Sequence, residues 1–192
     1  MEQRVKSLYK ALKLLTYFNE EHKEAGITEL AEYSGMLKSS VFNIMRTFEE
    51  CGYVKQDSDT RKYMLGGEIV SLFSRYKVTR SIDYRVTEYL QQIRDRFKVN
   101  TYLVERDGEK AVYLCAEQSF YKKDDRLVKE GTKIPLHCTA GGKVLLGYSA
   151  VSHKESVCSG KLERFTKNTI TDGSVLKAQL EKIIYDGYAV SN

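Results

Sequence analysis

The stretch from Ile27 to Arg46 constrains the fold most, because its apolar spacing predicts two short helices joined by a tight turn. Gly35 stands between the helices, where a residue free to take positive φ is favoured. Ala31 is expected where the helices cross, since a larger side chain would push them apart. The inner faces are expected to carry Leu30, Ala31, Ser34, Val41, Ile44, Met45 and Phe48. Together these features indicate a helix-turn-helix.

The outward face of the second helix is expected to be small, polar and basic, which suits a helix lying against base edges and phosphates. A helical hairpin inside an ordinary core is the alternative. The candidate DNA-binding residues of this helix are Lys38, Ser39, Ser40, Phe42, Asn43 and Arg46, with Thr47 on the same face.

The residues after this helix predict a β-hairpin. Residues 53–56 and 62–65 read as two short strands around a polar turn, after a helix stop at Gly52. A hairpin directly after a recognition helix is a wing, and its tip carries Arg61 and Lys62, which can reach phosphate or a narrow minor groove. A plain polar turn is the alternative.

A further helix is expected at the start of the chain. Helical spacing predicts that its inner face packs across the helix-turn-helix as the third member of a trihelical core. Thr28 is expected to be the N-cap of the helix that follows the Gly26 connector. The predicted inner face of the first helix consists of Val5, Leu8, Leu12, Leu15 and Phe18.

The composition is compatible with a nucleic-acid partner but does not establish one. The 192 residues suit one large or two small domains, with a net charge of +5 and a pI near 8.9. The four cysteines form no CxxC pair. With no signal peptide and no apolar run of about 20 residues, we expect a cytoplasmic protein with reduced thiols, no membrane association, no metal site and no cofactor.

The predicted domains are a winged helix-turn-helix over residues 1–66, a linker helix over 67–79 and an effector-binding domain over 80–192. Ser81 is expected to cap a helix that runs to Phe97. A helical connector is stiff, so it can transmit a change from one domain to the other.

From Asn100 the apolar period changes to two, which predicts strands. Residues 101–106 and 111–116 form a hairpin whose Asp107-Gly108 dipeptide favours a type I′ turn. Residues 125–128 and 134–137 are expected to be further strands. Helices are expected from Thr139 to Gly147 and from Asp172, its N-cap, to Gly187. This mixture indicates an α+β fold rather than a doubly wound sheet.

These motifs resemble the IclR family of bacterial transcriptional regulators over nearly the whole chain. The matching segments are SLYKALKLL, ITELAEYSGMLKSSV, GYVKQDSDTRKYMLG, IPLHCTAGGKVLLGY, FTKNTIT and GYAVS. The resemblance implies an N-terminal winged helix, a linker helix and a C-terminal effector-binding domain related to GAF and PAS sensors. It also implies a homodimer or homotetramer that binds double-stranded operator DNA and responds to a small molecule, often an organic acid.

The sequence departs from the family pattern in three places. Leu37 stands where the family often has proline, and Asn43 where it often has arginine. We expect these differences to alter the operator sequence rather than to abolish binding. Family members also continue past GYAVS through the closing strands of the effector sheet. The expected effector domain therefore lacks its last strands, as in a truncated chain or a degenerate sensor.

The candidate effector site lies at the helix start after Ile134. Unpaired N–H groups from Thr139 to Gly142 form an anion site there. The resemblance implies that backbone at Ala140 and Gly141 holds an effector carboxylate beside an apolar residue at Ile134. The alternative is that these small residues only permit tight helix–sheet packing.

Catalysis has little support in the sequence. His137, Cys138 and Thr139 could form a nucleophile group, but neighbouring residues on a strand point to opposite faces. Walker, Rossmann and paired-carboxylate motifs are absent. We therefore predict a sequence-specific transcriptional regulator, with repression favoured, whose operator binding is modulated by a small organic acid. The alternative is a GAF-like metabolite-binding module or enzyme.

Overall fold

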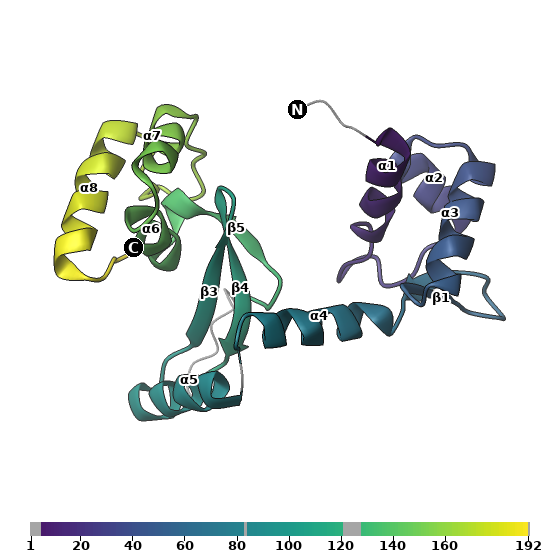
Figure 1. The fold of residues 1–192 in the computed structure, drawn as a ribbon, viewed down its shortest axis with the longest axis horizontal. Coiled ribbons are helices and arrows are strands. Elements are labelled where there is room, and N and C mark those ends of the chain that lie inside the picture. Colours follow the sequence, from purple (N-terminus) through teal and green to yellow (C-terminus); the bar gives the residue numbers. More distant parts are fainter. Residues whose placement is uncertain (1–4, 83, 121–127, 192) are drawn as a thin grey trace. The chain divides into compact units, whose positions relative to one another are not determined.

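The computed structural model describes residues 5–82, 84–120 and 128–191 of the chain. It divides into two compact units, Met1–Asp83 and Tyr84–Asn192 (Figure 1). None of the helices in the described segments is long and apolar enough to span a membrane.

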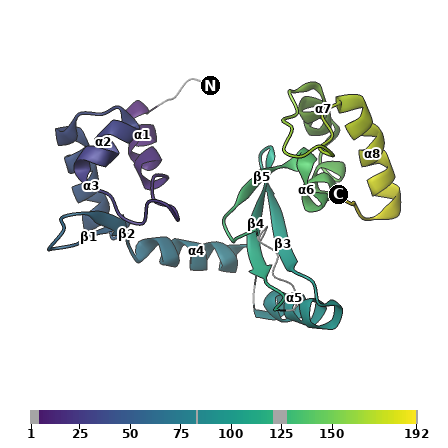
Figure 2. The same ribbon diagram turned by 180° about the vertical axis from the view of Figure 1, so that it is seen from behind.

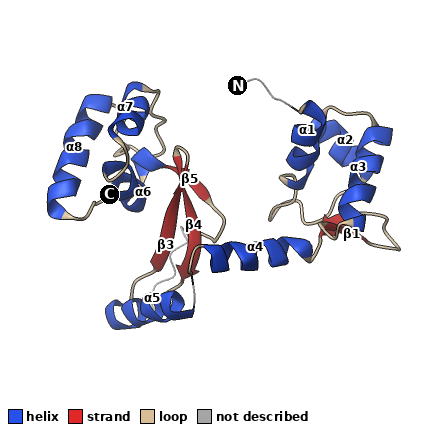
Figure 3. Ribbon diagram, viewed as in Figure 1, coloured by secondary structure: helices blue, strands red, loops and turns tan. Residues whose placement is uncertain are grey.

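The first unit is a winged helix-turn-helix, as predicted. Its helices are α1 (Lys6–Leu15), α2 (Ile27–Ser34) and α3 (Lys38–Glu50). Strands β1 (Val54–Gln56) and β2 (Tyr63–Leu65) then pair antiparallel, and α4 (Glu68–Thr79) follows them (Figure 3).

The core of this unit explains the turn between α2 and α3. Leu30, Val41 and Met45 are fully buried, so the apolar stripes predicted for the two helices do meet. Gly35 ends α2 with a φ of 64°, a left-handed conformation that a side chain would strain. Tyr63 of β2 is 1% exposed and joins the wing to the same core.

The inner face predicted for α1 is wrong in part. Val5, Leu8 and Leu12 are each more than half exposed, whereas Leu14 is completely buried. Apolar residues lie along two faces of this helix. The face that packs into the core is the one through Leu14, Leu15 and Phe18. In sequence this face is inconspicuous because a small residue, Ala11, stands on it.

Two predicted N-caps are also wrong. Helix α2 begins at Ile27, and its N-cap is Gly26 rather than Thr28. The Glu29 carboxylate accepts a hydrogen bond of 2.7 Å from the Gly26 N–H. Ser81 lies in the turn that closes α4, where its N–H donates to Val78 O at 3.0 Å and its φ is 54°. Helix α5 begins later, at Tyr84.

The second unit contains a three-stranded antiparallel sheet, β3 (Thr101–Asp107), β4 (Lys110–Glu117) and β5 (Lys133–Pro135), with β4 in the middle (Figure 2). Helix α5 (Tyr84–Phe97) and helix α6 (Ala140–Gly147) both contact β3 and β4. Helices α7 (Val151–Ser159) and α8 (Gly173–Asp186) pack against each other and against α6. The sequence did not predict α7.

Local details of this unit differ from the sequence prediction. Asp107 pairs with Lys110, so Gly108 and Glu109 form the turn, and of these two only Gly108 has positive φ, 59°. Type I′ requires positive φ at both positions, so that prediction is wrong. The strand predicted over residues 134–137 ends at Pro135, after which the short 3₁₀ helix η1 (Leu136–Cys138) follows.

The two ends predicted for α8 are confirmed. The Asp172 carboxylate accepts hydrogen bonds from the N–H groups of Ser174 and Val175, and so caps α8. Gly187 ends that helix with a φ of 79°. The strand predicted over residues 125–128 lies almost entirely outside the described residues.

Candidate DNA-binding surface and effector cavity

The face of α3 opposite its buried stripe carries the predicted DNA-binding side chains. Val41 and Met45 are buried in the core and Ile44 packs against it, whereas Phe42 and Asn43 between them are turned to solvent. Lys38, Ser39, Phe42, Asn43 and Arg46 are exposed and Ser40 is half-buried. The Arg46 side chain is 60% exposed and lies 3.6 Å from Glu50, a surface pair too weak to prevent Arg46 from reaching a phosphate.

The tip of the wing is built around Asp57. Its carboxylate accepts hydrogen bonds from the Thr60 N–H at 2.8 Å, the Thr60 hydroxyl at 3.0 Å and the Asp59 N–H at 3.1 Å. These bonds, those from Thr60 foremost, lower the pKa of Asp57. The turn therefore holds a fixed shape and presents Arg61, whose φ is 60°.

The two basic residues of the wing differ in their surroundings. Within the described segments the Arg61 guanidinium has no hydrogen-bond or ion-pair partner, and this residue is exposed. The Lys62 ammonium instead lies 2.9 Å from the Glu24 carboxylate, and this hydrogen bond raises the pKa of Lys62. Arg61 is therefore available to a phosphate, whereas Lys62 must first exchange its carboxylate partner.

In the second unit, a cavity of about 510 Å³ lies beside η1 and the start of α6. Of the predicted effector-binding residues it includes Ile134 and Thr139, but not Ala140, Gly141 or Gly142. The lining consists of Ile134, His137, Cys138, Thr139, Lys143, Phe165, Thr166, Asn168, Thr169, Ile170 and Ser191.

The start of α6 leaves fewer free donors than predicted. The Thr139 hydroxyl accepts a hydrogen bond of 3.1 Å from the Gly142 N–H and so caps the helix. A Cβ at Gly142 would lie 2.5 Å from Leu136 O, and one at Gly141 would lie 2.9 Å from Val104 Cγ2. Both glycines therefore permit close packing. The N–H groups of Ala140 and Gly141 have no acceptor within the described residues.

Lys143 is a buried member of the cavity that sequence reasoning missed. It is 5% exposed, and its Nζ donates to Val190 O at 3.1 Å. Burial lowers the pKa of this ammonium group. Helical periodicity could have found it, because Lys143 is in phase with the buried Leu146 and Gly147 of α6.

His137 and Cys138 do not form a nucleophile–base pair. The ring Nε2 of His137 donates to Glu163 O at 2.9 Å, and the Cys138 thiol donates to Pro135 O at 3.2 Å. Burial raises the pKa of the Cys138 thiol, which disfavours the reactive thiolate. In the described segments, His, Cys, Asp and Glu side chains form no cluster of three or more that could hold a metal ion.

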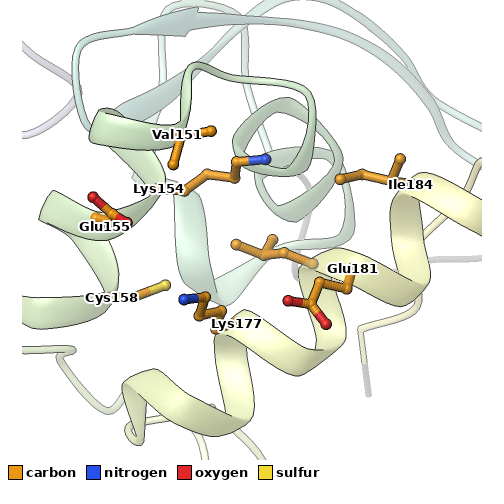
Figure 4. A pocket seen from close by; sticks show the side chains of 8 residues that line it. Val151, Lys154, Glu155, Cys158, Lys177, Glu181 and Ile184 are labelled. Carbon is orange, nitrogen blue, oxygen red and sulfur yellow. The ribbon is translucent and has the colours of Figure 1, made fainter.

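A second hollow, of about 210 Å³, is lined by residues of α7 and α8 (Figure 4). Its lining includes the apolar side chains of Leu180 and Ile184. It also includes the charged residues Lys154, Lys177 and Glu181. None of the candidate DNA-binding or effector-binding residues predicted from the sequence lines it.

The fold and the exposed face of α3 define a winged helix-turn-helix DNA-binding protein that carries a second, α+β unit with a cavity of mixed polar and apolar lining. The IclR helix-turn-helix domain matches residues 7–58, and the bacterial transcriptional regulator IclR C-terminal domain matches residues 75–192. The chain therefore belongs to the IclR family and is a DNA-binding transcriptional regulator.

Individual relatives agree with this assignment. The regulator XynR of Escherichia coli is 28% identical over 98% of this chain and 75% of its own length. The crystal structure of an IclR regulator from Alicyclobacillus acidocaldarius is 25% identical, with a TM-score of 0.84 over 99% of this chain and 77% of that one.

A third relative shares the fold alone. It is an IclR homologue from Microbacterium hydrocarbonoxydans, complexed with 4-hydroxybenzoate, with a TM-score of 0.86 at 18% identity over 96% of this chain and 76% of that one.

Proposed function

We propose that this chain represses transcription by placing α3 in the major groove of an operator and the β1–β2 wing against the adjacent backbone. The observation that carries the proposal is the outward face of α3, where Ser39, Phe42 and Asn43 stay exposed beside a tightly packed core. Residues 1–66 act as the DNA-binding domain, 67–79 as the linker helix and 80–192 as the effector-binding domain. The protein acts in the cytoplasm, where its operator is accessible.

The proposed contacts divide into those that read sequence and those that position the protein. Asn43 pairs with an adenine edge, for which a good bidentate contact contributes about 1–3 kcal/mol of discrimination. Lys38, Arg46, Arg61 and Lys62 contact phosphates, and Ser39, Ser40 and Phe42 fit between them.

The regulator binds as a homodimer, or as a homotetramer built from dimers. One short helix offers few base contacts, and a two-fold dimer doubles them on two half-sites. The exposed face of α1 is apolar, because Leu8, Tyr9 and Leu12 on it are each about half exposed. A second copy of this chain would cover such a face.

A small organic acid in the cavity beside Ile134 and Thr139 controls operator binding, without catalysis. The support is the combination of a cavity lined by both polar and apolar side chains, two N–H groups at the start of α6 that have no acceptor among the described residues, and the 4-hydroxybenzoate complex of a protein with the same fold. The bound acid acts on DNA affinity through the helical linker.

Selection of bound duplexes from a random DNA pool tests the proposal. Wild type should yield a two-fold symmetric motif. Asn43→Ala should change the preferred base at one position of each half-site, whereas Arg61→Ala should weaken binding to all sequences. Lys182→Ala, which removes an exposed charge from α8, serves as the control and should match wild type. An unchanged motif with Asn43→Ala would contradict the placement of α3.

A further inference from the structure

Lys143 is the single formally charged residue among those described as lining the cavity beside η1 and α6. None of the described lining residues is Asp or Glu, and Ile134, Phe165 and Ile170 supply apolar walls. The cavity thus combines one positive charge with apolar surface.

The described residues around Lys143 do not neutralise its charge. Its ammonium group has three protons to donate. The described residues provide one hydrogen-bond acceptor, Val190 O at 3.1 Å, and no carboxylate partner. At 5% exposure the ammonium has also lost most of its hydration. A buried charge in this state is costly, so an anion beside it would be strongly favoured.

Other polar groups at the cavity add donors rather than negative charge. Two hydroxyls at the cavity already accept hydrogen bonds within their own loop. The Thr166 hydroxyl accepts one from the Asn168 N–H, and the Thr169 hydroxyl accepts one from the Thr166 N–H. The Ser191 hydroxyl donates to Cys138 O at 3.3 Å. The Asn168 side-chain amide has no partner in the described segments and can donate to a ligand.

We propose that Lys143 is the counter-ion of the effector, and that the effector is a monocarboxylate with an aromatic or branched apolar body. Its carboxylate lies against the Lys143 ammonium and the Asn168 amide, and its apolar part lies against Phe165 and Ile170. This rests on the proposed function, in that the same cavity holds the effector. It adds that a negative charge, rather than shape alone, selects the ligand.

The first test needs no ligand. Lys143→Met keeps the length of the side chain but removes the unneutralised charge, so the unfolding temperature of this unit should rise or stay constant in calorimetry. Lys143→Gln, which keeps a donor for Val190 O, should behave likewise. If both variants unfold at clearly lower temperature than wild type, Lys143 is a structural tether and the proposal is wrong.

The second test uses three acids and their neutral amides, namely 4-hydroxybenzoate, benzoate and isovalerate, measured by titration calorimetry. Wild type should bind at least one acid at least tenfold more tightly than its amide, and both Lys143 variants should lose this preference. Lys154→Met is the matched control, because Lys154 also donates to a backbone carbonyl, Gly147 O at 3.2 Å, but lies outside the cavity. It should keep the preference.

The outcomes separate the two proposals. An acid that binds wild type and Lys143→Met equally well overturns the role of Lys143, as does the absence of acid binding by wild type. An acid whose binding depends on Lys143 but which leaves operator affinity unchanged supports the counter-ion and contradicts effector control of DNA binding.

Discussion

Gly141 allows a quantitative test of how α6 meets the sheet. A Cβ at this position would lie 2.9 Å from Val104 Cγ2, closer than such atoms normally approach. Overpacking of this kind costs about 1–3 kcal/mol. Alanine also favours the helix over glycine by roughly 0.5–1 kcal/mol, so Gly141→Ala should destabilise this unit by about 1 kcal/mol net.

Val104→Ala removes the atom that would clash. On its own it should cost about 1 kcal/mol, because Val104 is half-buried and loses two methyl groups. In the double variant the clash disappears and the helical preference of alanine remains. Gly141→Ala should therefore become neutral or stabilising in this background, with a coupling free energy of about 1–3 kcal/mol.

Urea unfolding followed by circular dichroism, with calorimetry to separate the two units, measures this cycle. Operator binding by the folded variants should be unchanged, because Gly141 and Val104 lie outside the DNA-binding unit. Additive effects of the two substitutions would refute the packing role. Gly141 would then be free for the ligand contact that its family resemblance implies.

Three further results are expected. Gly35→Ala should lower the free energy of unfolding of the first unit by about 1 kcal/mol, measured in urea, because alanine is strained at a φ of 64° although no atom lies near its Cβ. An unchanged free energy of unfolding would contradict this backbone strain. Glu24→Gln frees Lys62 from its 2.9 Å ion pair, so DNA affinity at low salt should rise, which fluorescence anisotropy measures; unchanged affinity would exclude Lys62 from the interface. Hydrogen bonds from Ser174 and Val175 lower the pKa of Asp172 below its ordinary 3.8. The ionised carboxylate therefore stabilises the folded state above pH 3.8, and this stabilisation is lost as the pH falls through the lowered pKa. Asp172→Ala should lower the unfolding temperature at pH 7, with a smaller difference near pH 3, and equal differences at both pH values would contradict the cap.

The winged helix could be predicted because its determinants are local. The stripe through Val41 and Met45, the turn at Gly35 and the hairpin after Gly52 each lie within a few residues of the structure they specify. The face of α1 could not be chosen from local pattern, because two stripes compete and the core selects the one through Leu14.

The cavity was predicted less completely because it is assembled from distant segments. Ile134 and Thr139 were recognised from one motif, whereas Phe165 and Asn168 come from a loop without periodicity, and Ser191 lies far along the chain. Lys143 stands inside the motif, but only packing shows that its ammonium is buried.

Binding to the selected operator duplex at several salt concentrations tests the central claim most directly. Each protomer brings four cations to phosphates, namely Lys38, Arg46, Arg61 and Lys62. For a dimer, log affinity should therefore fall against log salt with a slope of roughly −7. Two protomers should bind each duplex, and a scrambled duplex should bind far more weakly. A slope near zero, a single protomer per duplex or equal affinity for the scrambled sequence would contradict the account.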